Sequence, residues 1–464
     1  MRKPLANALD IDLRGGLTDK VTPHAGVALL IELGRRSGVI ATAEQALPAK
    51  RSPKGLRHGE LIESLVLLSA LGGDCLDDLE HLRRDQGLAA LTGYPLPAAA
   101  TVRQWLERLF HDPTTLTDRP AQGSFIPAET PALAGLRTVV EQSVRAYVAA
   151  AQPDRTVTLD VDAHLVVSSK REALPSYTGE RGYQPLLVTW AETDLVLADE
   201  FRDGNVPAST NIKALVDTAY AALPARAEGW VVRVRSDSAA YEHDILDHWA
   251  ARGWTFAVSA DMRRPLRAAI EALPEAAWQL WTEERGGVVR EWAEVVYVPS
   301  RVPERKDRQP NRYVAIRLRQ TQGRLFEDEI AVKHFAVLSN DWQMEGQALL
   351  EWQRGKAGTV EHSNRVLKDE LAGGVYPSGK FGANAAWLRL QVLTLNLLEL
   401  LKAVALDADL RQARPKRLRF VVFTQFGRLV DHARLRFLRV ASAALQTLVA
   451  PALGRIRRCR FAPG

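Results

Sequence analysis

The stretch TVTLDVDAHLVV, residues 156–167, decides the fold that the sequence predicts. Apolar and polar residues alternate along it, which is typical of a β-strand with one buried face. Four more strand-like runs follow: YQPLLVTWA (183–191), LVLADEF (195–201), WVVRVRSDS (230–238) and WTFAVSA (254–260). Helical patterns precede the last two runs, over 209–223 and 240–251. The chain therefore predicts three strands, then a helix, a strand, a helix and a strand.

That order is typical of a ribonuclease-H-like α/β fold, in which parallel strands flanked by helices extend an antiparallel trio. We expect this catalytic domain in two parts, residues 132–262 and 343–405. The segment between them, 263–342, contains several strand-like runs and predicts a mainly β insertion.

The flanking regions have a different texture. Residues 1–112 predict short helices joined by Gly-containing turns, as in helix-turn-helix DNA-binding proteins. Within them ATVRQWLERLF (100–110) has the length and polarity of a recognition helix, with Arg103 and Trp105 as candidate DNA contacts, although most such helix pairs only pack on each other. Residues 113–131 are rich in proline and predict a linker, and residues 406–464 form a basic C-terminal region.

Composition narrows the class of protein. The chain has 464 residues, 46% of them hydrophobic and 25% charged, which is ordinary for a globular protein of two to four domains. No membrane-spanning run or signal peptide is present, so we expect a cytoplasmic protein. Its two cysteines, Cys75 and Cys459, assemble neither a disulfide framework nor a thiolate zinc site. The net charge is +6, and basic residues concentrate in Arg-rich runs near the C-terminus. These runs either neutralise DNA phosphates or only keep the surface soluble.

Three acids, Asp160, Asp237 and Glu361, are placed where a phosphodiester-cleaving site needs them. Asp160 and Asp162 lie two apart on one strand and share a face, and Asp237 ends another strand. Glu361 begins a helical stripe that continues through Arg365 and Lys368. Converging carboxylates require a hard cation such as Mg²⁺, and two ions suit in-line displacement. Each acid taken alone has an ordinary structural alternative. Asp160 and Asp237 could each cap a helix or pair with a nearby Arg such as Arg235, and Glu361 could lie on a solvated helix face with ordinary ion pairs.

The strings LDVDAH (159–164), VRSDSAAY (234–241) and GTVEHSNRVLKDELAGGVYPSGKFGANAAW (358–387) resemble the three catalytic blocks of DDE-type transposases of bacterial insertion sequences, nearest to the thirteen-eighty group. The resemblance implies that Asp160, Asp237 and Glu361 hold two Mg²⁺ ions, which Mn²⁺ can replace. It also implies that Lys368 contacts a DNA phosphate. Relatives have an Arg four positions before the Glu; here that residue is Ala357, and the nearest cations are Arg354 and Lys356.

The activity that the resemblance implies is DNA transposition. The protein is expected to bind terminal inverted repeats, cleave the transposon ends and join the 3′-OH ends to target DNA, as a homodimer associated with the bacterial nucleoid. The turn PSGKFG (377–382) offers Lys380 to a phosphate but lacks the spacing of an ATP-binding loop. The insertion tryptophans, Trp278, Trp281 and Trp292, either stack on an extruded base or lie in the core. The rivals are a nuclease of this fold without strand transfer and a non-catalytic DNA-binding protein derived from a transposase.

Overall fold

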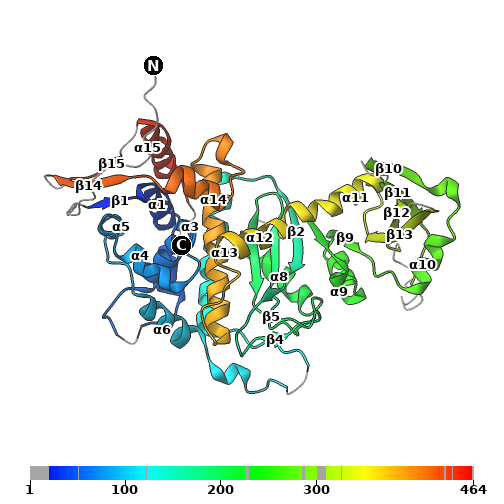
Figure 1. Cartoon of the computed structure of the whole chain (residues 1–464), viewed down its shortest axis with the longest axis horizontal. Coiled ribbons are helices and arrows are strands. Elements are labelled where there is room, and N and C mark those ends of the chain that lie inside the picture. The colour runs from blue at the N-terminus through cyan, green and yellow to red at the C-terminus, as the bar shows by residue number, and fades with distance from the viewer. Residues whose placement is uncertain are drawn as a thin grey trace.

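The computed structural model describes residues 20–50, 52–120, 123–224, 229–284, 288–299, 310–324, 327–432, 435–440 and 443–461. At its centre is a mixed sheet of nine strands in the order β10-β11-β12-β13-β9-β8-β2-β6-β7 (Figure 1). Helices pack on it, and a largely helical body made from both ends of the chain stands beside it.

Five strands form the half of this sheet that the sequence predicts. They are β2 (Thr156–Ala163), β6 (Leu186–Trp190), β7 (Leu195–Glu200), β8 (Val231–Ser236) and β9 (Thr255–Ser259). Strands β2, β6 and β7 are antiparallel neighbours, whereas β2, β8 and β9 run parallel. Helices α8 (Ile212–Ala221) and α9 (His243–Ala251) precede the two parallel strands. The predicted strands, helices and their order are confirmed.

The β-rich segment continues the same sheet. Its strands are β10 (Gln279–Glu284), β11 (Val288–Val295), β12 (Arg312–Arg324) and β13 (Glu327–Ser339), preceded by helix α10 (Arg264–Glu271). Strand β13 pairs antiparallel with β9, where Val337 lies opposite Ser259. Backbone hydrogen bonds therefore join this segment to the central strands, a pairing that the sequence did not predict.

A small sheet lies beyond the end of β2. It consists of β3 (Val166–Val167), β5 (Arg181–Tyr183) and β4 (Leu174–Pro175), in that order. The loop after β7 packs on it so closely that a Cβ on Gly204 would lie 2.8 Å from the carbonyl oxygens of both Gly182 and Leu174. Only glycine fits there, and the contact fixes the loop against the small sheet.

The N-terminal region is helical over most of its described residues. Its helices are α1 (Ala28–Arg36), α2 (Val39–Ala46), α3 (His58–Leu71), α4 (Leu79–Arg83), α5 (Gln86–Thr92) and α6 (Ala99–Phe110). Helix α3 ends before Gly72, whose φ of 90° is a left-handed cap that glycine adopts without strain. Residues 1–19 of the predicted DNA-binding region lie outside the described residues.

The C-terminal region folds back onto the N-terminal one. Strand β1 (Val21–Thr22) pairs with β14 (Gly427–His432), which pairs with β15 (Leu435–Val440), and helix α15 (Ala443–Arg458) packs beside α1 (Figure 1). Between the core and β14 lie α14 (Pro415–Leu418) and a π-helical turn, Arg419–Phe423. The two regions thus form one body, although the sequence predicts them as separate ends. The predicted domain boundaries stay predictions.

Helix α13 (Phe381–Val404) is buried along most of its length. It packs against α7 (Pro131–Ala151), α6, α3 and β7. Its polar residues make hydrogen bonds: the Asn396 side chain bonds to both the N–H and the C=O of Val196 at 2.9 Å, and Gln391 accepts from Ser69. Helices α11 (Gly346–Arg354) and α12 (Val360–Glu370) precede it. Within the described part of the chain, no helix is long and apolar enough to cross a membrane.

Candidate functional site

Two acids meet at the carboxyl ends of neighbouring parallel strands. In the β2–β8 register Val161 lies opposite Ser236, so the next residues, Asp162 and Asp237, come level with each other just past the end of the pairing. Asp237 leaves β8 and accepts a hydrogen bond from the N–H of Ala239 at 3.0 Å, which fixes its carboxylate at the start of a short helical turn. The carboxyl ends of parallel strands are where α/β folds place ligand sites.

Lys356 reaches this pair from the turn between α11 and α12. Its Nζ lies 2.8 Å from Oδ1 of Asp162 and 3.7 Å from Oε1 of Glu361. The residue is 6% exposed. Burial disfavours its charged form, but Asp162, Asp237 and Glu361 together outweigh that effect and raise the pKa of Lys356. One ammonium group therefore contacts two carboxylates and interacts electrostatically with a third.

Glu361 occupies the first turn of α12, as the sequence predicts for a helix in this segment. Its side chain is 52% exposed. Arg365 and Lys368 are exposed on the same stripe, one and two turns further on. The helix thus presents one carboxylate next to the other two acids and two cations beyond them, facing solvent.

Asp160 has a different environment from the one that the resemblance implies. It is 0% exposed, and Arg235 holds its two oxygens at 2.6 and 2.7 Å while the hydroxyl of Thr359 also donates to it. Burial raises the pKa of Asp160, and Arg235 opposes that rise. Both oxygens are occupied by protein donors. Lys356 contacts Asp162 and Glu361, whereas the oxygens of Asp160 are bound by Arg235 and Thr359.

Sequence reasoning named Asp162 only as a neighbour of Asp160 and did not name Asn364. The Nδ2 of Asn364 donates to Oδ2 of Asp162 at 2.8 Å. His164 lies nearby, and burial together with the charge of Lys368 lowers its pKa to about 4, so its imidazole is neutral at physiological pH. Arg235 stands two residues before Asp237, just as Asp160 stands two residues before Asp162. This equal spacing indicates which residues face each other only once the register of β2 with β8 is known.

The insertion tryptophans are engaged in packing. Trp292 is 5% exposed and fills the space above Gly346, where a Cβ would lie 2.2 Å from the indole ring. Of the two alternatives predicted for Trp292, core burial is the one that the structure shows. Trp278 carries the Arg317 guanidinium 4.3 Å from its ring centre, and Trp281 carries that of Arg354 at 5.0 Å.

The other predicted DNA contacts lie apart from the acids. Arg103 is exposed on α6, 3.4 Å from the carboxylate of Asp77. On the same helix Trp105 is half-buried, donates to Nδ1 of His58 at 3.1 Å and packs edge-on against Phe110, so it supports the helix packing. Lys380 is exposed at the N-terminus of α13.

Asp162, Asp237 and Glu361 are candidate ligands for a metal ion. Among the described residues, no group of three or more His, Cys, Asp or Glu side chains lies close enough to bind one. The Lys356 ammonium instead lies in contact with Asp162 and Glu361, and it interacts electrostatically with Asp237. The donor set nonetheless consists of carboxylate oxygens, which are the ligands that Mg²⁺ and Mn²⁺ prefer, and a cation already stands among them. Asp162, Asp237 and Glu361 therefore fit such an ion in the chemistry of their donor atoms.

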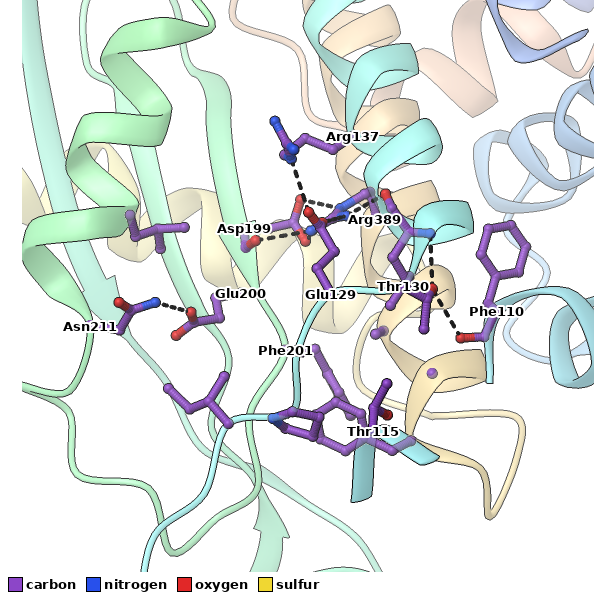
Figure 2. A pocket seen from close by; sticks show the side chains of 18 of the residues that line it. Phe110, Thr115, Glu129, Thr130, Arg137, Asp199, Glu200, Phe201, Asn211 and Arg389 are labelled. Atoms are coloured by element: carbon purple, nitrogen blue, oxygen red, sulfur yellow. Dashed lines mark hydrogen bonds and ion pairs between the residues drawn. The ribbon is translucent and has the colours of Figure 1, made fainter. Parts of the chain in front are cut away.

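A separate cavity, of about 370 Å³, lies between α7, β7 and α13 (Figure 2). Figure 2 shows Arg389 pointing at Asp199 and Glu129, which it contacts at 3.1 and 2.6 Å. Although burial opposes the charged form of Arg389, Asp199 and Glu129 raise its pKa. Its charge is neutralised within the protein. We infer that these ion pairs stabilise the packing of α13 against the edge of the sheet.

The chain is an α/β protein in which acids lie at the carboxyl ends of two parallel strands, next to a helix with exposed cations. The chain belongs to the family described as "Transposase DDE domain group 1", which residues 6–461 match. It is therefore a transposase of the DDE type. Comparison with curated proteins gave no match. Among solved structures, a piggyBac transposase synaptic complex with hairpin DNA aligns with a TM-score of 0.44 at 11% identity, over 84% of this chain and 78% of that one.

Proposed function

We propose that this transposase cleaves transposon ends and joins the resulting 3′-OH ends to target DNA, with Asp162, Asp237 and Glu361 as its metal-binding acids. The observation that carries the proposal is the position of Lys356, whose ammonium contacts two of these acids and lies within the field of the third. Asp162 replaces Asp160 in this assignment because the oxygens of Asp160 are taken by Arg235 and Thr359.

The sheet order supports a ribonuclease-H-like catalytic domain. Strands β7, β6, β2, β8 and β9 give an antiparallel trio extended by two parallel strands, and the acids lie where β2 and β8 end. Two Mg²⁺ ions, or Mn²⁺ in their place, would activate the attacking oxygen and stabilise the leaving oxygen of a phosphodiester. Within the protein, Asn364 orients Asp162, and the backbone N–H of Ala239 orients Asp237.

The exposed cations of α12 suit the DNA backbone on either side of the scissile phosphate. Lys368 and Arg365 continue the stripe that begins at Glu361, so a strand held at the acids passes both. The short helices of residues 20–112 and the basic C-terminal region, which form one body, are proposed to bind the terminal inverted repeats. A homodimer holding two ends, in the bacterial cytoplasm at the nucleoid, completes the proposal. Membership of the thirteen-eighty group rests on the three sequence blocks.

The test is cleavage of a labelled transposon end in Mg²⁺ by purified full-length protein, with the end sequence selected from random duplexes by binding. We expect Asp162→Asn, Asp237→Asn and Glu361→Gln each to lower cutting by at least a hundredfold while leaving binding to the end in place. Equal cutting by wild type and Asp162→Asn would sink the assignment of Asp162.

Pre-cut ends distinguish the rival activities. A transposase joins a labelled 3′-OH end to supercoiled target DNA, whereas a nuclease of the same fold leaves the end unjoined. A non-catalytic DNA-binding protein binds the ends but neither cuts nor joins them at any Mg²⁺ or Mn²⁺ concentration. Asp237→Asn serves as the control in each assay, since any activity that it retains comes from a contaminant.

A further inference from the structure

Strands β14 and β15 form an antiparallel ribbon at the outer edge of the helical body (Figure 1). Strand β1 pairs only with Gly427 and Arg428, at the base of this ribbon. Beyond these two residues the described part of the ribbon is two strands wide. Its two faces differ in their surroundings, because side chains alternate along each strand and directly opposite residues share a face.

The inner face of the ribbon, which carries Leu429, Asp431 and Arg436, is fixed to the body. Leu429 is 4% exposed. Further out, Asp431 pairs with Lys20 at 2.6 Å, and Arg436 donates to the carbonyl of Ala90 in α5 at 3.1 Å. These contacts hold the ribbon against the body and leave the opposite face to solvent.

The outer face of the ribbon consists of three cross-strand pairs, Arg428–Arg439, Val430–Phe437 and His432–Leu435. Phe437 is 45% exposed and Leu435 is 62% exposed. Apolar side chains gain no stability for the fold by standing in water, since burial of their surface is what would stabilise it. An exposed apolar strip bordered by charged residues is typical of a surface that binds a partner.

Arg428 and Arg439 lie directly opposite each other at the base of the outer face. Both are exposed. Like charges placed directly across a pair of strands destabilise the sheet. An anion bound between them would relieve this repulsion, and phosphate oxygens are acceptors that guanidinium groups bind strongly.

The charge of the ribbon favours duplex DNA over a second copy of the chain. The run Arg428–Arg439 contains four arginines and one aspartate, so a second copy that docked here would bring the same positive charge. DNA brings phosphates of the opposite sign. Its major groove, ~12 Å wide, admits a two-stranded β-ribbon, and apolar side chains contact thymine methyl groups there.

We propose that the outer face of the β14–β15 ribbon binds the major groove of the transposon end, with Arg428 and Arg439 at phosphates and Phe437 against the base edges. The inference rests on the proposed function, because the transposon end is its ligand. The ribbon belongs to the body formed by the two ends of the chain, whereas the acids lie on the central sheet. This contact therefore serves recognition of the end and takes no part in the chemistry of cleavage.

Fluorescence anisotropy of the full-length protein with the selected end duplex tests the proposal. We expect Arg439→Ala to weaken binding several-fold and to lower the slope of log affinity against log salt by ~0.9. Phe437→Ala should weaken binding and leave the slope unchanged, because an apolar contact releases no counterions. Arg439→Lys keeps the charge and the slope, and Lys213→Ala, on α8, is the matched control. Wild-type affinity in both alanine variants would overturn the proposal.

Interference by dimethyl sulfate identifies the groove. The reagent methylates guanine N7 in the major groove and adenine N3 in the minor groove. We expect methylated guanines within the end to block binding of the wild type, and one such block to disappear in Phe437→Ala. An interference pattern that is identical in the two proteins, or that is confined to adenines, would overturn the proposal.

Two measurements without DNA separate this surface from other roles. Because Arg439 faces Arg428, Arg439→Ala should melt at no lower temperature than wild type; a lower melting temperature would mark a structural residue and count against the proposal. Dissociation of a wild-type dimer by Phe437→Ala, seen by sedimentation, together with unchanged DNA binding, would assign the face to a second copy and overturn it. If the proposed function fails instead, the wild type binds the end without cutting it, and the binding measurements still decide the role of the ribbon.

Discussion

Arg235 binds both carboxylate oxygens of Asp160, with Nε 2.6 Å from Oδ1 and Nη2 2.7 Å from Oδ2. The two residues lie opposite each other in the parallel β2–β8 register, and both are buried. Arg235 continues to the backbone carbonyl of Trp352 in α11, so the pair links the sheet to the helix that leads into Lys356. The ion pair between Asp160 and Arg235 therefore connects β2 to α11 through the sheet.

The first prediction follows from that ion pair. Asp160→Asn leaves the Arg235 charge buried without its partner, and removing one member of a buried pair typically costs ~3–5 kcal/mol. We expect a loss of that order in the free energy of unfolding, measured by urea denaturation. Asp431→Asn, in an exposed pair with Lys20, is the control and should lose less than ~1 kcal/mol. Equal stability of the two variants would contradict a structural role for Asp160.

The strands and the α12 stripe were predictable from sequence because local periodicity specifies them. Choosing between Asp160 and Asp162 was not, since both lie on one face of β2 and spacing alone treats them alike. Only the register with β8 sets Arg235 opposite Asp160 and Asp237 level with Asp162. Register is a non-local property, fixed by the whole sheet.

Two other features also depended on contacts between distant parts of the chain. Strand β1, with only Val21 and Thr22, gives no pattern of its own and exists because β14 pairs with it. The pairing of Val337 with Ser259 likewise joins the insertion to the central sheet across a long stretch of sequence. For Trp292 the sequence left base stacking and core burial open, and core burial is the one observed.

A second prediction concerns Lys356. Because its ammonium lies among the three acids, a divalent ion must displace it or compete with its charge. We expect Lys356→Met to unfold more easily in EDTA than wild type and to gain more stability on adding Mg²⁺, about 1.4 kcal/mol more for each tenfold gain in affinity. Thermal melts with and without Mg²⁺ measure this. Lys356→Arg keeps the charge and should resemble wild type; an identical Mg²⁺ response in all three proteins would refute the prediction.

The third prediction concerns the cations of α12. Lys368→Ala and Arg365→Ala each remove one proposed phosphate contact, so each should weaken binding to the end several-fold and lower the slope of log affinity against log salt by ~0.9. Fluorescence anisotropy over a range of KCl concentrations measures both quantities. Lys213→Ala removes an exposed cation on α8 and is the matched control. Slopes unchanged from wild type would remove these two residues from the DNA interface.

The fourth prediction is a pH dependence of stability that originates in α13. Burial raises the pKa of Glu399 from its ordinary 4.5 to about 7, with Lys402 at 2.6 Å opposing the rise and Asp194 adding to it. The native state therefore holds this proton more tightly than the unfolded chain does. The resulting stabilisation is complete below pH ~4.5 and is lost as the pH rises to ~7, by up to ~3 kcal/mol.

Glu399→Gln cannot ionise, so the difference in unfolding free energy between this variant and wild type should change between pH 5 and pH 8, with wild type losing more. Urea denaturation at each pH measures it. Exposed Asp409→Asn, near the end of the same helix, should keep the wild-type profile. Parallel curves for wild type and Glu399→Gln would mean that Glu399 ionises as readily in the folded protein as in the unfolded chain. The side chain would then reach solvent through the cavity that it shares with His362 and Lys402.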